Sequence, residues 1–205
     1  MTGAIVSIID DDPDVRDSLR ALLESAGIQV RAFDSAKKVL DDPTLSQSGC
    51  LIADIRMPDM DGLTLQEELA RRQVGLPVIV VTGHGDVPLA VRAMRAGAVD
   101  FLEKPFDDEL LLDSVRRALS LSAETRSKAL TARVAKDRID LLTERERQVL
   151  AHLIAGHANK VIAYELDISP RTVEIHRANL MDKMQARSLS ELVRLAIAAG
   201  LSSSG

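Results

Sequence analysis

Three carboxylates of this chain stand where short apolar segments end. Asp10 and Asp11 directly follow the first such segment, and Asp54 lies at the end of the third. If these segments are parallel strands of a doubly wound sheet, their carboxyl ends meet at one edge and bring the three acids together. Clustered carboxylates repel one another unless a divalent cation neutralises them, and an all-oxygen ligand set suits Mg²⁺. Asp10, Asp11 and Asp54 therefore predict a magnesium site.

A hydroxyl group and an ammonium group are expected at the same edge. Thr82 ends the fourth apolar segment, and Lys104 follows the fifth. Taken singly, the two residues are typical of a strand end and of a surface lysine. Beside an acidic pocket, the pair supplies the hydrogen-bond donors and the positive charge that a bound phosphoryl group requires.

The acidic run has other interpretations. Asp12, Asp14 and Asp17 are expected to cap and charge the first turn of the following helix. A haloacid-dehalogenase-type phosphohydrolase would use Asp10 and Asp12, but Asp14 stands where that family has Thr or Val, and Asp54 would have no role. A calcium loop would lack both the glycine of its turn and the acid that closes it.

Five apolar segments alternate with helical patterns in the first 121 residues. The first, third and fourth segments are apolar on both faces, as strands buried inside a parallel sheet are. Apolar residues recur at helical spacing in 15–26, 64–72 and 87–96. The alternation predicts an α/β fold, a doubly wound five-stranded parallel sheet of the flavodoxin-like type. The expected strands are Ile5–Ile9, Gln29–Phe33, Cys50–Ile55, Pro77–Thr82 and Ala98–Leu102.

The composition indicates a globular protein of two domains. The 205 residues are 46% hydrophobic and 28% charged, and residues 1–121 carry a net charge of −8 whereas 143–205 carry +1. Nucleic-acid binding by the C-terminal part would therefore depend on a few well-placed basic groups. Aromatic residues make up 2% of the chain, which argues against a base-stacking surface.

Two further expectations concern the cell compartment and the single cysteine. No apolar stretch approaches the roughly 20 residues that span a bilayer, so a cytoplasmic protein without membrane contact is predicted. Cys50 has apolar neighbours and no second cysteine to pair with, so it is expected to be a buried core residue.

The segment between Pro105 and Gly156 contains neither glycine nor proline. Residues with high helix propensity fill it, and its apolar residues recur at roughly helical spacing. We expect the last helix of the first domain to continue into the linker. The predicted division is a first domain at 1–121, a helical linker at 122–141 and a second domain at 142–205.

Start signals for four short helices follow the linker. Thr143 and Glu146 form a capping box, and Asn159 is expected to cap the second helix. Ser169 and Pro170 indicate the start of a third helix after a short turn, and Ser188 caps a fourth. Two short helices joined by a tight turn favour an all-α helix-turn-helix domain, although a protein-binding helical bundle would have the same pattern.

The first 120 or so residues resemble the receiver domains of two-component signalling. The resemblance rests on the segments IIDDDPDVRDSL, DIRMPDMDG, VVTGHGD and GAVDFLEKPF, in this order. It implies a cis Lys104–Pro105 peptide bond. The implied site residues are Asp54 as phosphoacceptor, Asp10, Asp11, Asp54 and the Arg56 carbonyl as Mg²⁺ ligands, Lys104 as the group that pairs with the phosphoryl group, and Thr82 and Phe101 as switch residues.

The same resemblance implies a mechanism of activation. Asp54 would attack the phosphoryl group of a phosphohistidine on a sensor kinase and form an acyl phosphate. The added charge, about −1.5 to −2, would draw Thr82 toward the phosphoryl group and let Phe101 turn inward. The adjacent helical segment would then change its surface, where Val87 and Val91 are candidate contacts for dimerisation.

Residues 141–200 resemble the four-helix DNA-binding domains of the LuxR/NarL class. The resemblance rests on LTERERQVLAHLIAGHANKVIAYELDISPRTVEIHRANLMDKM. It implies that the third helix enters the major groove and that the fourth, at 189–199, is the dimer surface of this domain. The implied base-edge residues are Glu174, Ile175 and Ala178, and the implied phosphate contacts are Lys160, Arg171, Thr172, Arg177 and Lys183.

As a whole, the chain is identified as a member of the two-component response regulators of the LuxR/NarL/FixJ class, with most resemblance to the nitrogen-fixation members. The resemblance implies a transcriptional activator switched on by phosphorylation, whose only chemistry is Mg²⁺-dependent self-phosphorylation and slow self-dephosphorylation. The expected partners are a sensor histidine kinase, which for nitrogen-fixation members is the oxygen-sensing FixL, double-stranded DNA, a second copy of the phosphorylated chain, and RNA polymerase.

Overall fold

The structure is a computed structural model that describes residues 4–83, 85 and 87–201. The chain divides into two compact units, Met1–Thr125 and Arg126–Gly205, which are described separately. Two residues of the segment VVTGHGD, His84 and Asp86, lie outside the described residues. Among the described helices, none is both long and apolar enough to cross a membrane.

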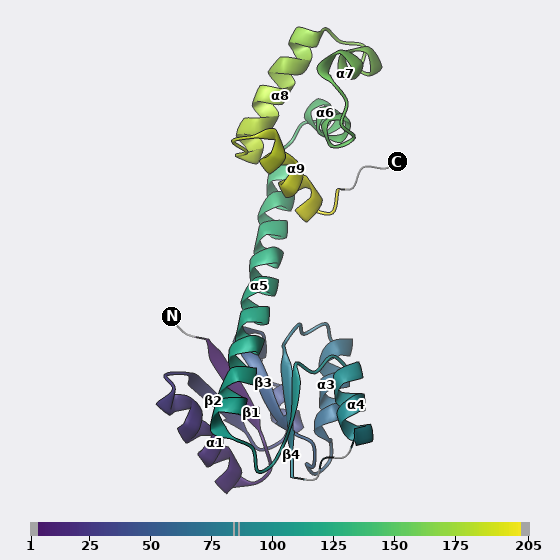
Figure 1. The fold of residues 1–205 in the computed structure, drawn as a ribbon. Helices are drawn as coiled ribbons and strands as arrows, with labels where there is room; N and C mark the ends of the chain where they lie inside the picture. The colour runs from purple at the N-terminus through teal and green to yellow at the C-terminus, as the bar shows by residue number, and fades with distance from the viewer. Residues whose placement is uncertain (1–3, 84, 86, 202–205) are drawn as a thin grey trace. The chain divides into compact units, whose positions relative to one another are not determined.

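The first unit contains a five-stranded parallel sheet with the strand order β2-β1-β3-β4-β5 (Figure 1). The α/β fold predicted from the sequence is confirmed. The first two strands have the predicted bounds, whereas the third begins two residues earlier and the fifth two residues later than predicted. The strands are β1 Ile5–Ile9, β2 Gln29–Phe33, β3 Ser48–Asp54, β4 Val78–Thr82 and β5 Asp100–Glu103.

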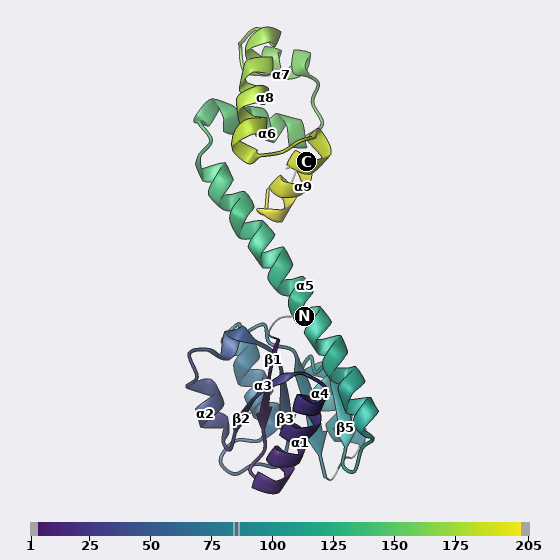
Figure 2. The same cartoon turned by 90° about the vertical axis from the view of Figure 1, so that its left-hand side faces the viewer.

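Helices cover both faces of this sheet (Figure 2). One face packs against α1 and the first three turns of α5, and the other packs against α2, α3 and α4. A short 3₁₀ helix at Leu45–Gln47 precedes β3. The helices are α1 Pro13–Ser25, α2 Ala36–Leu40, α3 Gly62–Arg71, α4 Val87–Arg95 and α5 Asp108–Asp140.

Side chains of the central strand alternate between the two apolar cores. In β3, Cys50 and Ile52 point to the core beneath α1 and α5, and Leu51 and Ala53 point to the core beneath α2 to α4. This is the period-two arrangement of a strand buried on both faces. Burial raises the pKa of the Cys50 thiol to about 12, as expected of a core cysteine that is inert near neutral pH.

Helix α5 runs without interruption from Asp108 to Asp140. The lack of glycine and proline in this segment predicts such continuity, because both residues disfavour a helix interior. The domain bounds 121/122 and 141/142 remain a prediction.

The second unit contains four short helices around one apolar core: α6 Glu144–Ile154, α7 Asn159–Glu165, α8 Pro170–Met184 and α9 Leu189–Ala198. The predicted all-α architecture is confirmed. The Thr143–Glu146 capping box forms, and Ser169 and Ser188 cap α8 and α9 with their side chains. Between α7 and α8, Asp167 adopts a left-handed backbone conformation, φ 53°, which makes the turn tight.

The prediction that Asn159 caps α7 is wrong. Ala158 occupies the N-cap position, without a side-chain cap, and Asn159 is the first helical residue. The Asn159 side chain instead accepts a hydrogen bond from Arg177 of α8. A tertiary contact between the two helices therefore uses the oxygen that would have capped the helix locally.

Candidate functional site

Three predicted site residues come together at the carboxyl edge of the sheet. Asp10 directly follows β1, Asp54 ends β3, and Lys104 directly follows β5. The Lys104 ammonium donates to Asp10 Oδ2 at 2.7 Å and to Asp54 Oδ1 at 2.8 Å. Asp10 is 2% exposed and Asp54 is 6% exposed. Two buried carboxylates thus share one ammonium group.

The backbone around Asp54 fixes its carboxylate. The Arg56 amide donates to Asp54 Oδ2 at 2.7 Å, so both carboxylate oxygens have a donor. Helix α3 begins against the same residue: a Cβ atom added to Gly62 would lie 2.3 Å from the Asp54 carbonyl oxygen. Only glycine permits this approach. Gly62 lies in the segment DIRMPDMDG, but the sequence alone gave it no role.

Asp10 is fixed in a similar way. The Asp12 amide donates to Asp10 Oδ1 at 3.0 Å, and the Arg16 guanidinium donates to the Asp10 carbonyl oxygen at 2.6 Å. Asp12 itself caps α1, as predicted, by accepting from the Asp14 amide. Arg16 is a supporting residue that the sequence did not single out, because its contact depends on the packing of α1 against the end of β1.

The predicted metal ligands are only partly gathered. Asp11 is exposed, whereas Asp10 and Asp54 are buried beside Lys104. Within the part of the chain that the structure describes, no three His, Cys, Asp or Glu side chains are grouped closely enough to hold a metal ion. The donor set itself is all oxygen, and Asp10 and Asp54 with one shared ammonium leave one negative charge uncompensated. That charge and that chemistry fit Mg²⁺.

The surroundings of the site shift the pKa values of Asp54 and Lys104. Burial is the largest influence on the pKa of Asp54 and raises it, the Lys104 contact lowers it, and the Asp10 charge raises it again, so the pKa lies above its ordinary value of 3.8. Burial lowers the pKa of Lys104, but hydrogen bonds to Asp10 and Asp54 outweigh burial and keep it above 10.5. Lys104 therefore stays charged, whereas burial and the Asp10 charge destabilise the ionised form of the neighbouring Asp54 carboxylate.

Thr82 and Phe101 belong to the paired strands β4 and β5, which end beside Lys104. Thr82 ends β4 and is fully buried, and its carbonyl oxygen accepts from the Lys104 amide at 2.7 Å. Phe101 of β5 is half-buried against the core beneath α2 to α4. A Cβ atom at Gly85 would lie 3.3 Å from the Phe101 ring, and the Gly85 amide donates to Glu103 Oε1 at 3.2 Å. Gly85 thus lies close to the Phe101 ring.

Two further features were predicted from the resemblance. The Lys104–Pro105 peptide bond is cis, as expected. On α4, Val87 is 77% exposed and Val91 is 43% exposed, and Met94 of the same helix is exposed as well. These side chains give the helix an apolar surface.

The predicted DNA-contacting residues divide into two groups. Lys160, Arg171, Glu174, Ile175 and Ala178 are exposed. The other three are half-buried and have partners within the domain. Those contacts are a Thr172 hydroxyl–Ser169 hydroxyl hydrogen bond at 2.8 Å, an Arg177–Asn159 hydrogen bond, and a Lys183–Glu146 ion pair at 2.8 Å.

Two protein families match different parts of the chain. Residues 6–116 match the response regulator receiver domain family, and residues 140–196 match the bacterial regulatory proteins of the luxR family. The chain is 50% identical over 200 residues to the transcriptional regulatory protein FixJ of Bradyrhizobium diazoefficiens, covering 98% of each chain. It is 45% identical to the response regulator protein TodT of Pseudomonas putida, covering 94% of this chain and 85% of that protein.

A solved structure matches at full length as well. The response regulator StyR aligns with a TM-score of 0.83 and 46% sequence identity, covering 95% of this chain and 98% of that one. The family matches, the full-length relatives and the fold agree on one assignment. The chain belongs to the two-component response regulators that join a receiver domain to a LuxR-family DNA-binding domain.

Proposed function

We propose that Asp54 accepts a phosphoryl group and that the modified receiver activates DNA binding by the C-terminal domain. The observation that carries this proposal is the bridge from Lys104 to Asp10 and Asp54. It combines a nucleophilic carboxylate with a fixed cation at one edge of a parallel sheet, where open α/β folds bind their ligands.

The transfer step follows from these groups. An oxygen of the Asp54 carboxylate attacks phosphorus, the bond from phosphorus to the donor's imidazole nitrogen breaks, and that imidazole keeps the electron pair and takes up a proton. Lys104 moves its hydrogen bond from Asp54 to an oxygen of the incoming group. The Arg56 amide continues to hold the carboxylate oxygen that does not attack.

Asp10, Asp11, Asp54 and the Arg56 carbonyl would hold Mg²⁺, which offsets the charge on the phosphoryl oxygens when it is bound. Support for this ligand set comes from its all-oxygen chemistry and from the negative charge that remains when Lys104 is shared by Asp10 and Asp54. Asp11 contributes from the exposed side of the pocket.

Thr82 and Phe101 act as the switch in this proposal. A new phosphoryl oxygen accepts a hydrogen bond from the Thr82 hydroxyl. The loop beyond Thr82 then moves together with Thr82. Because Gly85 lies against the Phe101 ring, movement of the loop frees space into which the ring can turn. The surface of α4 then changes, and Val87 and Val91 provide the apolar contact for a second copy of the chain.

Dimerisation would align two α8 helices on two half-sites of DNA. Glu174, Ile175 and Ala178 read base edges, while Lys160, Arg171, Thr172, Arg177 and Lys183 contact phosphates. The exposed members are free to make these contacts as they lie, whereas Arg177 and Lys183 would first exchange their partners within the domain. Helix α9 is the proposed dimer surface of this domain, and the exposure of Leu189 and Ile197 supports this assignment.

The partners in this proposal are a sensor histidine kinase, double-stranded DNA and RNA polymerase, and the protein acts in the cytoplasm. The proposed kinase is the oxygen-sensing FixL, as the resemblance to the nitrogen-fixation members implies. The proposed domain bounds are 1–121 for the receiver, 122–141 for the helical linker and 142–205 for the DNA-binding domain.

The Asp54→Asn variant tests the proposal. Wild-type protein incubated with acetyl phosphate and Mg²⁺ should gain one phosphoryl group by intact mass, become dimeric in sedimentation and bind DNA more tightly. The variant should do none of these while keeping a native circular dichroism spectrum, because the amide is nearly isosteric but cannot form the acyl phosphate. Labelling of the variant at the wild-type level would contradict the assignment of Asp54.

A pair of substitutions in α8 tests the DNA contacts. Arg171→Ala should weaken binding to every duplex and flatten the salt dependence, because phosphate contacts carry no sequence information. Glu174→Ala should change the preferred sequence instead. If neither change affected DNA binding, a protein-binding role for the helical domain would be favoured.

A further inference from the structure

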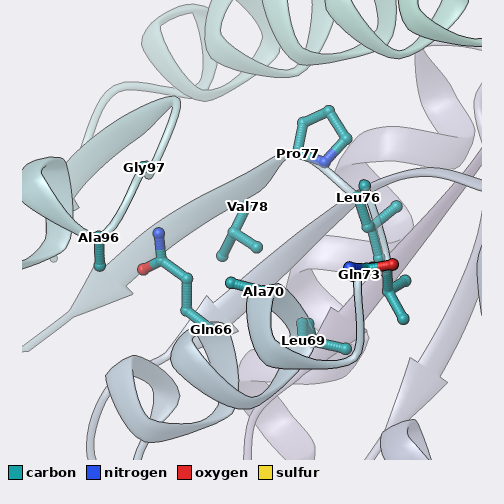
Figure 3. A pocket seen from close by; sticks show the side chains of 11 residues that line it. Gln66, Leu69, Ala70, Gln73, Leu76, Pro77, Val78, Ala96 and Gly97 are labelled. Carbon is teal, nitrogen blue, oxygen red and sulfur yellow. The ribbon is translucent and has the colours of Figure 1, made fainter.

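A cavity of about 300 Å³ lies at the opposite edge of the receiver sheet from Asp54. It is open to solvent on one side, and residues at the ends of α3 and α4 and at the start of β4 line it (Figure 3). Its volume corresponds to about ten water molecules and lies at the lower end of the range for small-molecule sites. Size alone therefore admits a molecule of about ten non-hydrogen atoms.

The lining of the cavity is neutral and combines apolar side chains with polar atoms. Leu69, Val74, Leu76, Pro77 and Val78 are the larger apolar residues that line it. Among the described residues, none of those that line the cavity carries a charge. A charged ligand would lose its hydration here without gaining a partner. The wall thus selects a neutral molecule with an apolar body.

Two glutamine side chains line this space: Gln66, which is buried, and Gln73, which is exposed. Gln66 of α3 is only 4% exposed, and its amide extends into the space between Ala96 and Val78 (Figure 3). The amide nitrogen of Gln66 donates to the Ala93 carbonyl oxygen at 3.5 Å, a long hydrogen bond. Its Oε1 atom is buried and has no hydrogen-bond partner among the described residues. A buried acceptor without a donor is costly, so Oε1 favours a ligand that brings one.

We propose that this cavity binds a small neutral organic molecule with an apolar body and one hydroxyl or N–H group, which donates to Gln66 Oε1. The site is independent of the phosphoacceptor chemistry, because its walls include none of the residues assigned to that chemistry. Gln66 sets which molecules are accepted, and the apolar wall provides the area that is buried.

Benzyl alcohol and anisole are suitable probes, because they are isomers of similar size and only the alcohol has a donor. Each is titrated into the intact unphosphorylated protein, and the backbone amide signals of Leu69, Val74 and Gly97 are followed by NMR. Benzyl alcohol should bind with a Kd on the order of 1 mM, and anisole about fivefold to tenfold more weakly. Equal binding of the two isomers, or no shift at these amides with either, would overturn the proposal.

Three variants separate the parts of the site. Gln66→Met keeps the length of the side chain without the acceptor, so it should remove the difference between the isomers. Ala70→Leu, at an exposed position of the wall, should fill the cavity and abolish binding of both. Glu67→Gln is the control on the outer face of α3 and should change neither affinity. Benzyl alcohol that still bound to the Ala70→Leu variant would show that it binds elsewhere.

Discussion

Lys104 in the first unit and Lys183 in the second make ion pairs of nearly the same length. Lys104 lies 2.8 Å from Asp54 Oδ1 and 2.7 Å from Asp10 Oδ2, and Lys183 lies 2.8 Å from Glu146 Oε2. All three carboxylates are buried. By distance and burial the two lysines are hard to tell apart, yet one belongs to the phosphoacceptor pocket and the other connects two helices.

The other partners of each carboxylate make the difference. Burial raises the pKa of Glu146, but hydrogen bonds from Lys183 and from Thr143 outweigh burial, so the pKa lies below its ordinary value of 4.5. Burial also raises the pKa of Asp54, and there the nearby Asp10 charge adds to burial, so the pKa stays raised. An ammonium group shared by two acids leaves each less stabilised than an ammonium group that serves one.

The two ion pairs differ in whether the carboxylate is stabilised in its ionised form. The Glu146 carboxylate is satisfied by the capping box and by α8, and its role is complete within the folded domain. The Asp54 carboxylate is held in a less stable ionised state, and an incoming phosphoryl group or a cation can relieve that instability. A raised pKa of an acid beside a lysine is therefore more informative than the ion pair alone.

The largest expected effect separates the two lysines by chemistry. Lys104→Met should slow the phosphorylation of Asp54 by acetyl phosphate about hundredfold, because it removes a fixed donor and a positive charge from the transferring group. Lys183→Met should leave the rate unchanged. Initial rates from intact-mass measurements on both variants provide the check, and a similar loss in both would remove the distinction between the pairs.

The next effect concerns the stability of the second unit. Lys183→Met should lower its free energy of unfolding by about 1–2 kcal/mol, because a buried carboxylate loses its ammonium while solvent at the partly exposed lysine limits the loss. Hydrogen exchange of the α6 and α8 amides measures this change. The control is Lys160→Met, which replaces an exposed lysine of α7 and should leave stability unchanged while flattening the salt dependence of DNA binding.

A stability loss as small for Lys183→Met as for Lys160→Met would show that the ion pair contributes nothing. In that case Lys183 would exchange Glu146 for a DNA phosphate at little cost in stability. A double variant with Glu146→Gln refines this result, because removing both charges should cost less than the sum of the single changes.

The acidic pocket was more predictable from the sequence than the Lys183 pair. Asp10, Asp54 and Lys104 each stand at the end of an apolar strand, and the topology of a parallel sheet brings such positions to one edge. Nothing local links Glu146 to Lys183, because their contact depends on how α6 packs against α8. Lys183 was therefore predicted only as a phosphate contact.

Elements with a long apolar segment were likewise more predictable than short ones. Strands β1 and β2 have the bounds that their apolar segments predict. Strand β5 begins two residues late because the apolar residue Ala98 follows α4, where its amide donates to the Ala93 carbonyl oxygen. Helix α2 has five residues, too few for a periodic pattern, and was not predicted. The cavity beside Gln66 has no charged or motif residue to mark it in the sequence.

A smaller effect should have opposite signs in the two units. At neutral pH, Asp54→Asn should raise the free energy of unfolding of the first unit by about 1 kcal/mol, because it replaces a carboxylate that the folded state disfavours. Glu146→Gln should lower that of the second unit by about 1 kcal/mol, because glutamine keeps the capping box but loses the ion pair. Hydrogen exchange reports each unit separately. Changes of the same sign in both units would contradict the contrast drawn between Asp54 and Glu146.

The smallest effect is the pH dependence of the second unit. Because the pKa of Glu146 in the folded state is below its ordinary value of 4.5, its carboxylate stabilises the fold above pH 4.5. This contribution is lost as the pH falls from 4.5 through the lower pKa of the folded state, with a slope of at most about 1.4 kcal/mol per pH unit. Urea unfolding followed through the NMR amide signals of α8 at several pH values measures the slope. Glu146→Gln should reduce it, and an unchanged slope in that variant would assign the acid sensitivity to other carboxylates of the domain.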